Sequence, residues 1–461
     1  MVINLKNDIP KYQYGIFHLL KMIFPYDTVV QNQETADVNV TFTLNQSTVT
    51  VFFGEHAHTE PIIRDDILLS LKRAVYKVTG SDLPFGVLTG VRPSKTALKF
   101  EDDIVKNLEE VYFVSPQKGS VMEHCAKKVI SVTDRLTPGQ LSLYINIPFC
   151  PSRCRYCSFT LGYLKPYPML IDSYLSALLC ELKAMLQTVA QCNLQLNSIY
   201  IGGGTPTVLN EIQLGELMDT IVNNTNLPGE FTVEAGRADT ITKEKLQVLK
   251  DSGVSRISIN PQTLNQKTLE LIGRRHSVEE FYHAYEWSRQ IGFETVNTDL
   301  IAGLAEETFL DFKNSLDGIL QLAPEHITVH TLCKKRTSNL VEPMEEETAK
   351  EVVKMLDYTY RVMEGEYEPY YIYRQKNAIS SLENIGFMRN QKECAYNIFM
   401  MEEASSVLAV GAGGTSKLVD YQTKSPFSKL RTDKQPERYI RDLSEGIKKK
   451  QQFLLEGMNL I

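Results

Sequence analysis

The chain has 461 residues, of which 43% are hydrophobic and 23% charged, and its formal net charge is −7 at pH 7. This length suits roughly two or three domains with a large core. The negative charge argues against a general nucleic-acid or anionic-membrane binder. The first residues contain no apolar signal core, and no stretch is long enough to span a membrane. These features predict a cytoplasmic protein whose scattered cysteines are reduced thiols.

The first 138 residues contain both strand and helix patterns. Residues 38–53 alternate apolar and polar side chains around Asn45, Gln46 and Ser47, which predicts a β-hairpin. Helical periodicity follows at 62–79, 101–111 and 120–136. The run GVRPSKTA at 90–97 holds a basic pair that could meet carboxylates, although a helix start is favoured. A small α+β domain over 1–138 is therefore expected.

From residue 139 onward, short apolar runs alternate with long amphipathic segments. The apolar runs lie at 141–147, 196–202, 229–235, 254–260, 293–301 and 325–332. The amphipathic segments lie at 168–190, 211–223, 242–252, 264–273, 278–291 and 307–321. Such strand–helix repeats predict a parallel sheet with right-handed crossovers. Because only six occur, the α/β fold expected over 139–334 is a partial (β/α)6 barrel, with its active site at the carboxyl ends of the strands.

The remainder, 335–461, is less regular. It contains a helical pattern near 345–364, a tyrosine-rich run at 367–377, a glycine-rich turn at 409–417 and a basic amphipathic end. We expect a C-terminal α+β extension.

Three cysteines follow the first predicted strand of the barrel. Cys150, Cys154 and Cys157 have the spacing C-x3-C-x2-C, so one short loop can wrap them around a metal centre. Three thiolates are one ligand short of a closed iron–sulfur or zinc site, which leaves one position for chemistry. A structural zinc ion with a distant fourth ligand is the alternative.

Polar residues and glycines occur where the other predicted strands end. The second strand ends in GGGTPT, residues 202–207, where glycines allow a backbone to approach a ligand closely, unless they only form a tight turn. Four polar residues end later repeats or follow them, namely Glu234, Gln262, Arg274 and Asp299. One alone would usually be a helix cap, but four in succession indicate a cofactor with carboxylate, amine and ribose groups.

YINIPFCPSRCRYC, GGGTPT and this order of polar residues together resemble the radical S-adenosylmethionine (SAM) family of oxygen-independent coproporphyrinogen III oxidases. The segments VEAGRADT, YYIYRQKN and GAGGTSK are most similar to its HemZ-type branch. The resemblance covers about residues 80–455 and implies a radical SAM partial barrel.

The resemblance also implies cofactors and ligands. The three cysteines would bind three irons of a [4Fe–4S] cluster, and SAM would bind the fourth. One or two SAM molecules are expected. The positions that match the family's SAM contacts are Tyr144, Tyr156, Gly203, Gly204, Thr205, Glu234, Gln262, Arg274 and Asp299.

The activity that the resemblance implies is oxidative decarboxylation of a tetrapyrrole. Reductive cleavage of SAM gives a 5′-deoxyadenosyl radical, which takes a hydrogen atom from the β-carbon of a propionate. Loss of carbon dioxide and a second electron leaves a vinyl group, so that coproporphyrinogen III becomes protoporphyrinogen IX. A flavodoxin- or ferredoxin-like electron donor and a monomeric enzyme are expected.

Two positions depart from the family's decarboxylase. Asn146 stands where that enzyme has histidine, and Ser158 and Phe159 follow Cys157 where it has a fourth cysteine. Two further hypotheses follow: a heme chaperone that keeps the cluster and SAM site, and a radical SAM enzyme acting on another tetrapyrrole. No catalytic histidine pair stands out, and His330, near the end of the sixth strand, is interpreted as structural rather than catalytic.

Overall fold

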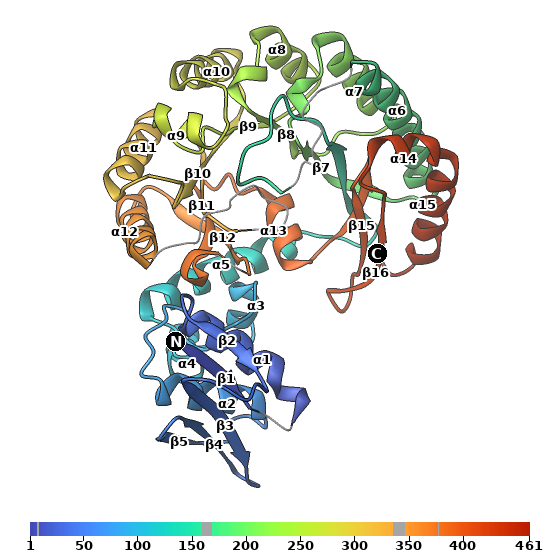
Figure 1. The fold of residues 1–461 in the computed structure, drawn as a ribbon. Coiled ribbons are helices and arrows are strands. Elements are labelled where there is room, and N and C mark those ends of the chain that lie inside the picture. The colour runs from blue at the N-terminus through green and yellow to red at the C-terminus, as the bar shows by residue number, and fades with distance from the viewer. Residues whose placement is uncertain (7–8, 159–167, 335–345, 377) are drawn as a thin grey trace. The chain divides into compact units, whose positions relative to one another are not determined.

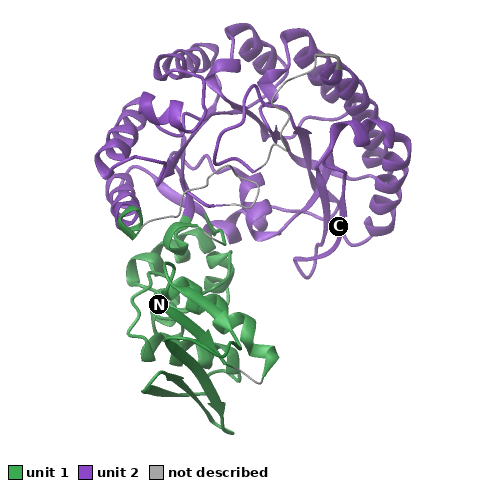
Figure 2. Ribbon diagram, viewed as in Figure 1, with its two compact units in different colours: residues 1–127, 344–349, 372–383 green, residues 128–343, 350–371, 384–461 purple. Residues whose placement is uncertain are grey.

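The computed structural model describes residues 1–6, 9–158, 168–334, 346–376 and 378–461. The chain divides into two compact units (Figure 2). The first comprises residues 1–127, 344–349 and 372–383, and the second comprises 128–343, 350–371 and 384–461. The sequence pattern divides the chain into three domains with boundaries at 138 and 334, and this division stays a prediction.

The first unit contains a five-stranded sheet in the order β2-β1-β3-β4-β5. Its strands are β1 (Val2–Leu5), β2 (Thr28–Gln31), β3 (Val38–Leu44), β4 (Thr48–Phe53) and β5 (His56–Pro61). Its helices are α1 (Pro10–Ile23), α2 (Ile67–Val78), α3 (Pro93–Ala97), α4 (Ile104–Tyr112) and most of α5 (Pro116–Thr133). The predicted hairpin is confirmed as β3 and β4, which pair antiparallel.

Local chemistry explains where helices of this unit begin. The predicted helix at 62–79 starts only at Ile67, because the Asp66 carboxylate caps it by accepting from the Leu69 backbone N–H at 2.9 Å. In the GVRPSKTA run, Pro93 opens α3, so the predicted helix start is confirmed.

The second unit is built on an eleven-stranded sheet in the order β12-β13-β11-β10-β9-β8-β7-β6-β14-β15-β16. The strands are β6 (Gln140–Ile147), β7 (Gln195–Gly203), β8 (Phe231–Gly236), β9 (Arg256–Ile259), β10 (Thr295–Ala302), β11 (His326–Thr331), β12 (Glu368–Arg374), β13 (Glu383–Met388), β14 (Ser406–Val410), β15 (Thr415–Asp420) and β16 (Ser425–Arg431).

Helices connect these strands. They are α6 (Pro168–Gln191), α7 (Glu211–Val222), α8 (Lys243–Asp251), α9 (Gln266–Leu271), α10 (Val278–Ile291), α11 (Phe309–Leu322), α12 (Glu346–Met363), α13 (Ala395–Glu402), α14 (Pro436–Arg441) and α15 (Leu443–Gly457). Capping boxes open α7, α10 and α11, in each of which the N-cap and the third helical residue satisfy each other's backbone N–H groups. Most of the helices lie along the outer side of the curved sheet (Figure 1).

The six predicted strands are confirmed as β6 to β11, and each pairs parallel with its neighbour. The sheet order has two ends among the strands described, so the barrel is partial, as predicted. All six carboxyl ends therefore lie at one edge, where Asn146 pairs with Gly202 across β6 and β7. Among the described helices, none combines the length and apolar character needed to cross a membrane.

The C-terminal segment is more regular than the sequence pattern suggests. The glycine-rich turn joins β14, which pairs parallel with β6, to the antiparallel strand β15. On the other side of the sheet, β13 pairs antiparallel with β11. Strands from this segment thus extend the parallel sheet at both ends.

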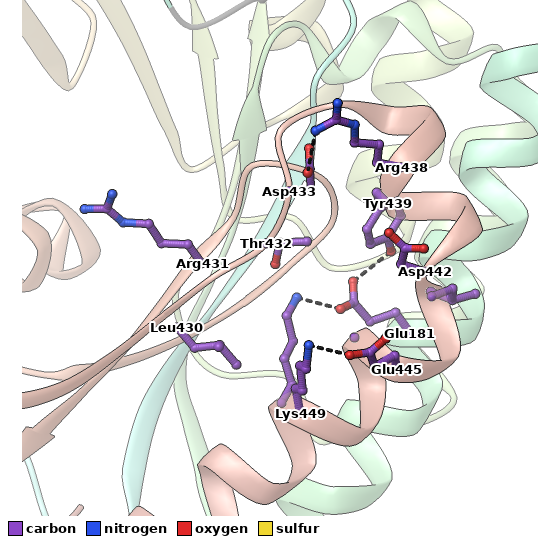
Figure 3. Close-up of a pocket in the computed structure, with 13 residues that line it drawn as sticks. Glu181, Leu430, Arg431, Thr432, Asp433, Arg438, Tyr439, Asp442, Glu445 and Lys449 are labelled. Atoms are coloured by element: carbon purple, nitrogen blue, oxygen red, sulfur yellow. Dashed lines mark hydrogen bonds and ion pairs between the residues drawn. The ribbon is translucent and has the colours of Figure 1, made fainter.

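A buried ion pair attaches the C-terminal helix α15 to α6. The Lys450 ammonium lies 2.5 Å from the Glu181 carboxylate, and their side chains are only 3% and 1% exposed. Glu181 also accepts from the Tyr439 hydroxyl and the Gly411 backbone N–H, both at 2.7 Å. Glu181, Tyr439 and Lys450 line a cavity of about 330 Å³, which is also lined by the exposed ion pair of Lys449 with Glu445 (Figure 3).

Replacing Lys450 by methionine is expected to lower the free energy of unfolding by about 3–5 kcal/mol, because Glu181 is left buried without its cation. The neighbouring change Lys449→Met is the matched control, since its exposed pair with Glu445 contributes less than about 1 kcal/mol. Urea unfolding followed by circular dichroism measures both. Equal effects of the two substitutions would contradict the assigned role of the buried pair.

Candidate functional site

The three-cysteine loop leaves the carboxyl end of β6 and packs onto the ends of the neighbouring strands. Cys154 is buried, and Cys150 and Cys157 are half-buried. Burial, together with the charges of Cys157 and Cys154, raises the pKa of the Cys150 thiol to about 11. The thiols therefore share one poorly hydrated region, where a positively charged metal centre would favour their ionised form.

The glycine-rich end of β7 makes the close contact that positions this loop. The Gly204 N–H donates to the Ile147 carbonyl at 2.7 Å, and the Thr205 N–H donates to the Phe149 carbonyl at 2.8 Å. A Cβ atom on Gly204 would lie 2.3 Å from the Phe149 oxygen. The glycines are thus required because another segment of the protein's own backbone packs against them. The Thr205 hydroxyl lies 3.3 Å from the Cys150 sulfur.

A buried arginine that the sequence analysis did not select lies beside the loop. Arg237 is 2% exposed, and its guanidinium donates to the Ser152 hydroxyl at 2.7 Å and lies 4.0 Å from the Cys154 sulfur. Two further bonds, at 2.9 and 2.7 Å, join it to the Asp239 carboxylate. The sequence offers one signal that could have selected Arg237: it is a charged residue directly after Gly236, which ends a strand, in the segment VEAGRADT.

Glu234 and Asp299, predicted as cofactor contacts, lie in one polar cluster on the sheet. Glu234 accepts from the Tyr200 hydroxyl at 2.5 Å. Burial raises the pKa of Glu234 to about 7, and the charge of Asp299 contributes to the rise. Asp299 in turn lies 3.7 Å from the His330 imidazole. His330 therefore lies beside Asp299, and its interpretation as a structural residue stays a prediction.

Tyr144 lies two residues before Asn146 on β6, in a stack of three tyrosines of which Tyr396 is buried and the other two are half-buried. Its ring centroid is 6.2 Å from that of Tyr200 and 6.3 Å from that of Tyr396, and the last two are 4.4 Å apart. Its hydroxyl donates to the Asn146 side-chain oxygen at 3.1 Å, and the Asn146 amide donates to the Ala412 carbonyl. Asn146 thus joins β6 to the turn between β14 and β15.

Gln262 and Arg274 keep hydrogen-bonding capacity that the described residues do not use. The Gln262 side-chain oxygen and the Arg274 Nε are buried without a partner in this part of the chain, although two other Arg274 nitrogens donate to the Asn260 and Gly236 carbonyls. Gln262 also has a positive φ of 71°, a strained conformation that is common at functional sites. Orphaned buried groups at two predicted ligand contacts fit a polar cofactor.

Tyr156 has a different environment from the other predicted residues. It packs against an apolar cluster formed by Leu269, Ile272, Ile301 and Leu304. Burial raises its pKa well above the usual value. Its ring therefore anchors the cysteine loop between α9 and the end of β10.

Three thiols on one short loop are a donor set that an iron–sulfur cluster can use, because each thiolate would bind one iron. In the part of the chain that the structure describes, no three His, Cys, Asp or Glu side chains are placed to share a single metal ion.

Comparisons with known proteins give the family of this chain. The model of the Radical SAM superfamily matches residues 144–318. The chain is 36% identical over 377 residues to the oxygen-independent coproporphyrinogen-III oxidase-like protein HemZ of Bacillus subtilis (strain 168), a match covering 78% of this chain and 75% of HemZ. It is 41% identical over 196 residues to the heme chaperone HemW of the same strain, covering 41% of this chain but only 50% of HemW.

A solved structure has a similar fold. The coproporphyrinogen III oxidase HemN from Escherichia coli, described as a radical SAM enzyme, gives a TM-score of 0.54 at 22% identity. The match covers 70% of this chain and 73% of HemN.

Arg237→Met is expected to reduce the iron and sulfide retained after anaerobic reconstitution, because it releases Ser152 and leaves Asp239 unpaired, at a cost of about 3–5 kcal/mol. Arg155→Met, at an exposed arginine of the same loop, is the control and should retain wild-type iron. Far-UV circular dichroism checks folding. Wild-type iron content in Arg237→Met would contradict the role of this residue.

Glu234 predicts a pH dependence of stability. Its raised pKa means that the folded state keeps this proton up to about pH 7, whereas the unfolded chain releases it near 4.5. The free energy of unfolding should therefore fall between pH 5 and 8, by up to about 3 kcal/mol from this group. Burial also raises the pKa of Glu307 to about 7, so both test variants carry Glu307→Gln. The free energy of unfolding is measured against pH for this single variant and for the double variant that also carries Glu234→Gln. Parallel stability curves for the two variants would refute the assignment.

Proposed function

Because this chain belongs to the oxygen-independent coproporphyrinogen-III oxidase-like family of radical SAM proteins, we propose that it converts coproporphyrinogen III into protoporphyrinogen IX. In this reaction two propionates each lose a β-hydrogen and carbon dioxide, and a vinyl group remains. Each propionate gives up two electrons: one leaves with the hydrogen atom that the deoxyadenosyl radical takes, and the other passes to an electron acceptor, which the reaction therefore requires. The observation that carries the proposal is the three-cysteine loop held between Thr205 and Arg237 at the carboxyl edge of a partial barrel.

We assign cofactor binding to the residues at this edge. Cys150, Cys154 and Cys157 would hold a [4Fe–4S] cluster, with SAM completing it. Together these groups supply the one-electron chemistry needed to break an unactivated C–H bond. Thr205 and Arg237 hold the loop by direct contacts to Cys150 and Ser152, so the thiols stay in place while a ligand binds.

The polar cluster suits the remaining groups of SAM. The carboxylates of Glu234 and Asp299 can accept from ribose hydroxyls and an ammonium. The unused Gln262 oxygen and Arg274 Nε offer one further acceptor and one further donor. Tyr144, Tyr156, Gly203 and Gly204 form the walls that fix the loop and the strand ends. The proposal allows one or two SAM molecules.

We further propose a flavodoxin- or ferredoxin-like electron donor and a monomeric, cytoplasmic protein. Arg155 is exposed on the cysteine loop, where its positive charge would favour an acidic donor.

A heme chaperone is the second candidate. It is favoured by the 41% identity to HemW and by the residues after Cys157, which are Ser158 and Phe159 where the family's decarboxylase has a fourth cysteine. A radical SAM enzyme acting on another tetrapyrrole is the third candidate.

The deciding experiment is anaerobic. The chain is reconstituted with iron and sulfide, reduced, and given SAM and coproporphyrinogen III, while 5′-deoxyadenosine and vinyl porphyrins are quantified. Both products should form, and both should disappear in Cys154→Ala, which lacks one cluster ligand.

Other outcomes select the alternatives. If deoxyadenosine forms without vinyl products, the chain is a radical SAM enzyme whose substrate is not coproporphyrinogen III. Neither product, together with stoichiometric heme binding, would favour the chaperone. Cys180→Ala, at an exposed cysteine outside the loop, is the matched control.

A further inference from the structure

Five basic side chains converge in the first unit, away from the cysteine loop in sequence. Burial lowers the pKa of His18 on α1, and the charges of four cations lower it further: Lys376, Lys72, Arg374 and Lys21. These groups come from α1, α2 and the chain at and after the end of β12. We call them the basic cluster. Like charges gathered around a half-buried histidine repel one another, so the arrangement is costly without an anion.

Arg374 is a buried cation without a carboxylate of its own. It is 6% exposed, and its guanidinium donates to the Leu88 and Ser381 carbonyls at 2.5 and 2.9 Å. Burial lowers its pKa to about 10, opposed by Glu383. Glu383, however, already lies 2.5 Å from the Lys118 ammonium. One carboxylate therefore faces two buried cations, so Arg374 and Lys118 together carry more positive charge than Glu383 balances.

Lys72 has the same character. Its ammonium donates to the Thr89 hydroxyl, a neutral partner, at 2.7 Å. Burial lowers its pKa, and the carboxylate that opposes this shift is Asp66. That carboxylate caps α2 by accepting from the Leu69 N–H. Among the described residues neither the half-buried Lys72 nor the buried Arg374 has a carboxylate in ion-pair contact, so a bound anion would supply countercharge to both.

The cluster opens to solvent beside an aromatic side chain. Lys376 is exposed and donates to the Tyr14 hydroxyl at 2.6 Å, and Tyr14 is 64% exposed. The segment next to Thr89 leaves space, since nothing lies within 4 Å of a Cβ placed on Gly90. The backbone N–H of Arg374 binds the Val91 carbonyl at 2.8 Å and so holds this segment against β12. Cations beside an exposed ring suit a ligand with both carboxylates and a flat apolar body.

We propose that the basic cluster binds propionate carboxylates of the tetrapyrrole on which the protein acts. This inference rests on the proposed function, which supplies the ligand class. It gives the first unit a role in substrate capture, and it uses Arg374 and Lys376, which lie in the tyrosine-rich run that the cofactor site does not use. Lys72 and Lys376 are its accessible contacts.

The test measures porphyrin binding to the full-length chain by fluorescence, with coproporphyrin III as the carboxylate-bearing probe and etioporphyrin, which has no carboxylates, as its counterpart. Lys72→Gln and Lys376→Gln should each weaken coproporphyrin III binding by about tenfold, the effect of losing one charge-assisted hydrogen bond. Etioporphyrin binding should not change. Lys106→Gln, at an exposed lysine of the same unit, is the control and should behave as wild type.

Three results would overturn the inference: unchanged affinity in both variants, an equal loss for etioporphyrin, or no binding of coproporphyrin III by the wild type. Lys376 is exposed, so its variant keeps the test informative if Lys72→Gln fails to fold. Failure of the proposed function is seen separately, as intact porphyrin binding without formation of deoxyadenosine or vinyl products.

Discussion

The site depends on one close contact between two backbone segments at the carboxyl edge of the large sheet. The end of β7 lies so near the start of the cysteine loop that only glycine fits at Gly204, where a Cβ would be 2.3 Å from the Phe149 oxygen. Two backbone hydrogen bonds across the contact fix where the loop begins. Thr205 and Phe149 make one of these hydrogen bonds, and the Thr205 hydroxyl lies 3.3 Å from the sulfur of the next loop residue, Cys150.

The C-terminal segment braces the same edge. Asn146, on β6, binds the Ala412 carbonyl 266 residues later in the chain, and Tyr174 joins both through its hydroxyl. The adjacent Gly411 binds Glu181, the carboxylate buried with Lys450. The last helix is thereby coupled to the first strand of the barrel, so the C-terminal extension is part of the scaffold that holds the cysteine loop.

The repeat pattern of the sequence predicts β6 to β11, because short runs rich in apolar residues alternate there with amphipathic segments of helical period. Periodicity does not reveal β12 to β16, whose places depend on pairing with strands distant in sequence. Spacing alone selects the cysteines and the polar strand ends. It cannot select Arg237, because its partner Ser152 lies 85 residues away, nor the basic cluster, whose members come from separate elements. The ligand roles of the selected residues stay predictions.

The most direct test of this account is the metal content and electron paramagnetic resonance spectrum of the anaerobically reconstituted chain, recorded after reduction with and without SAM. The account predicts about four iron atoms per chain, as in a [4Fe–4S] cluster, and a spectrum that changes when SAM is added, because one iron has no cysteine ligand. One firmly bound zinc ion per chain, or an iron–sulfur spectrum indifferent to SAM, would contradict it.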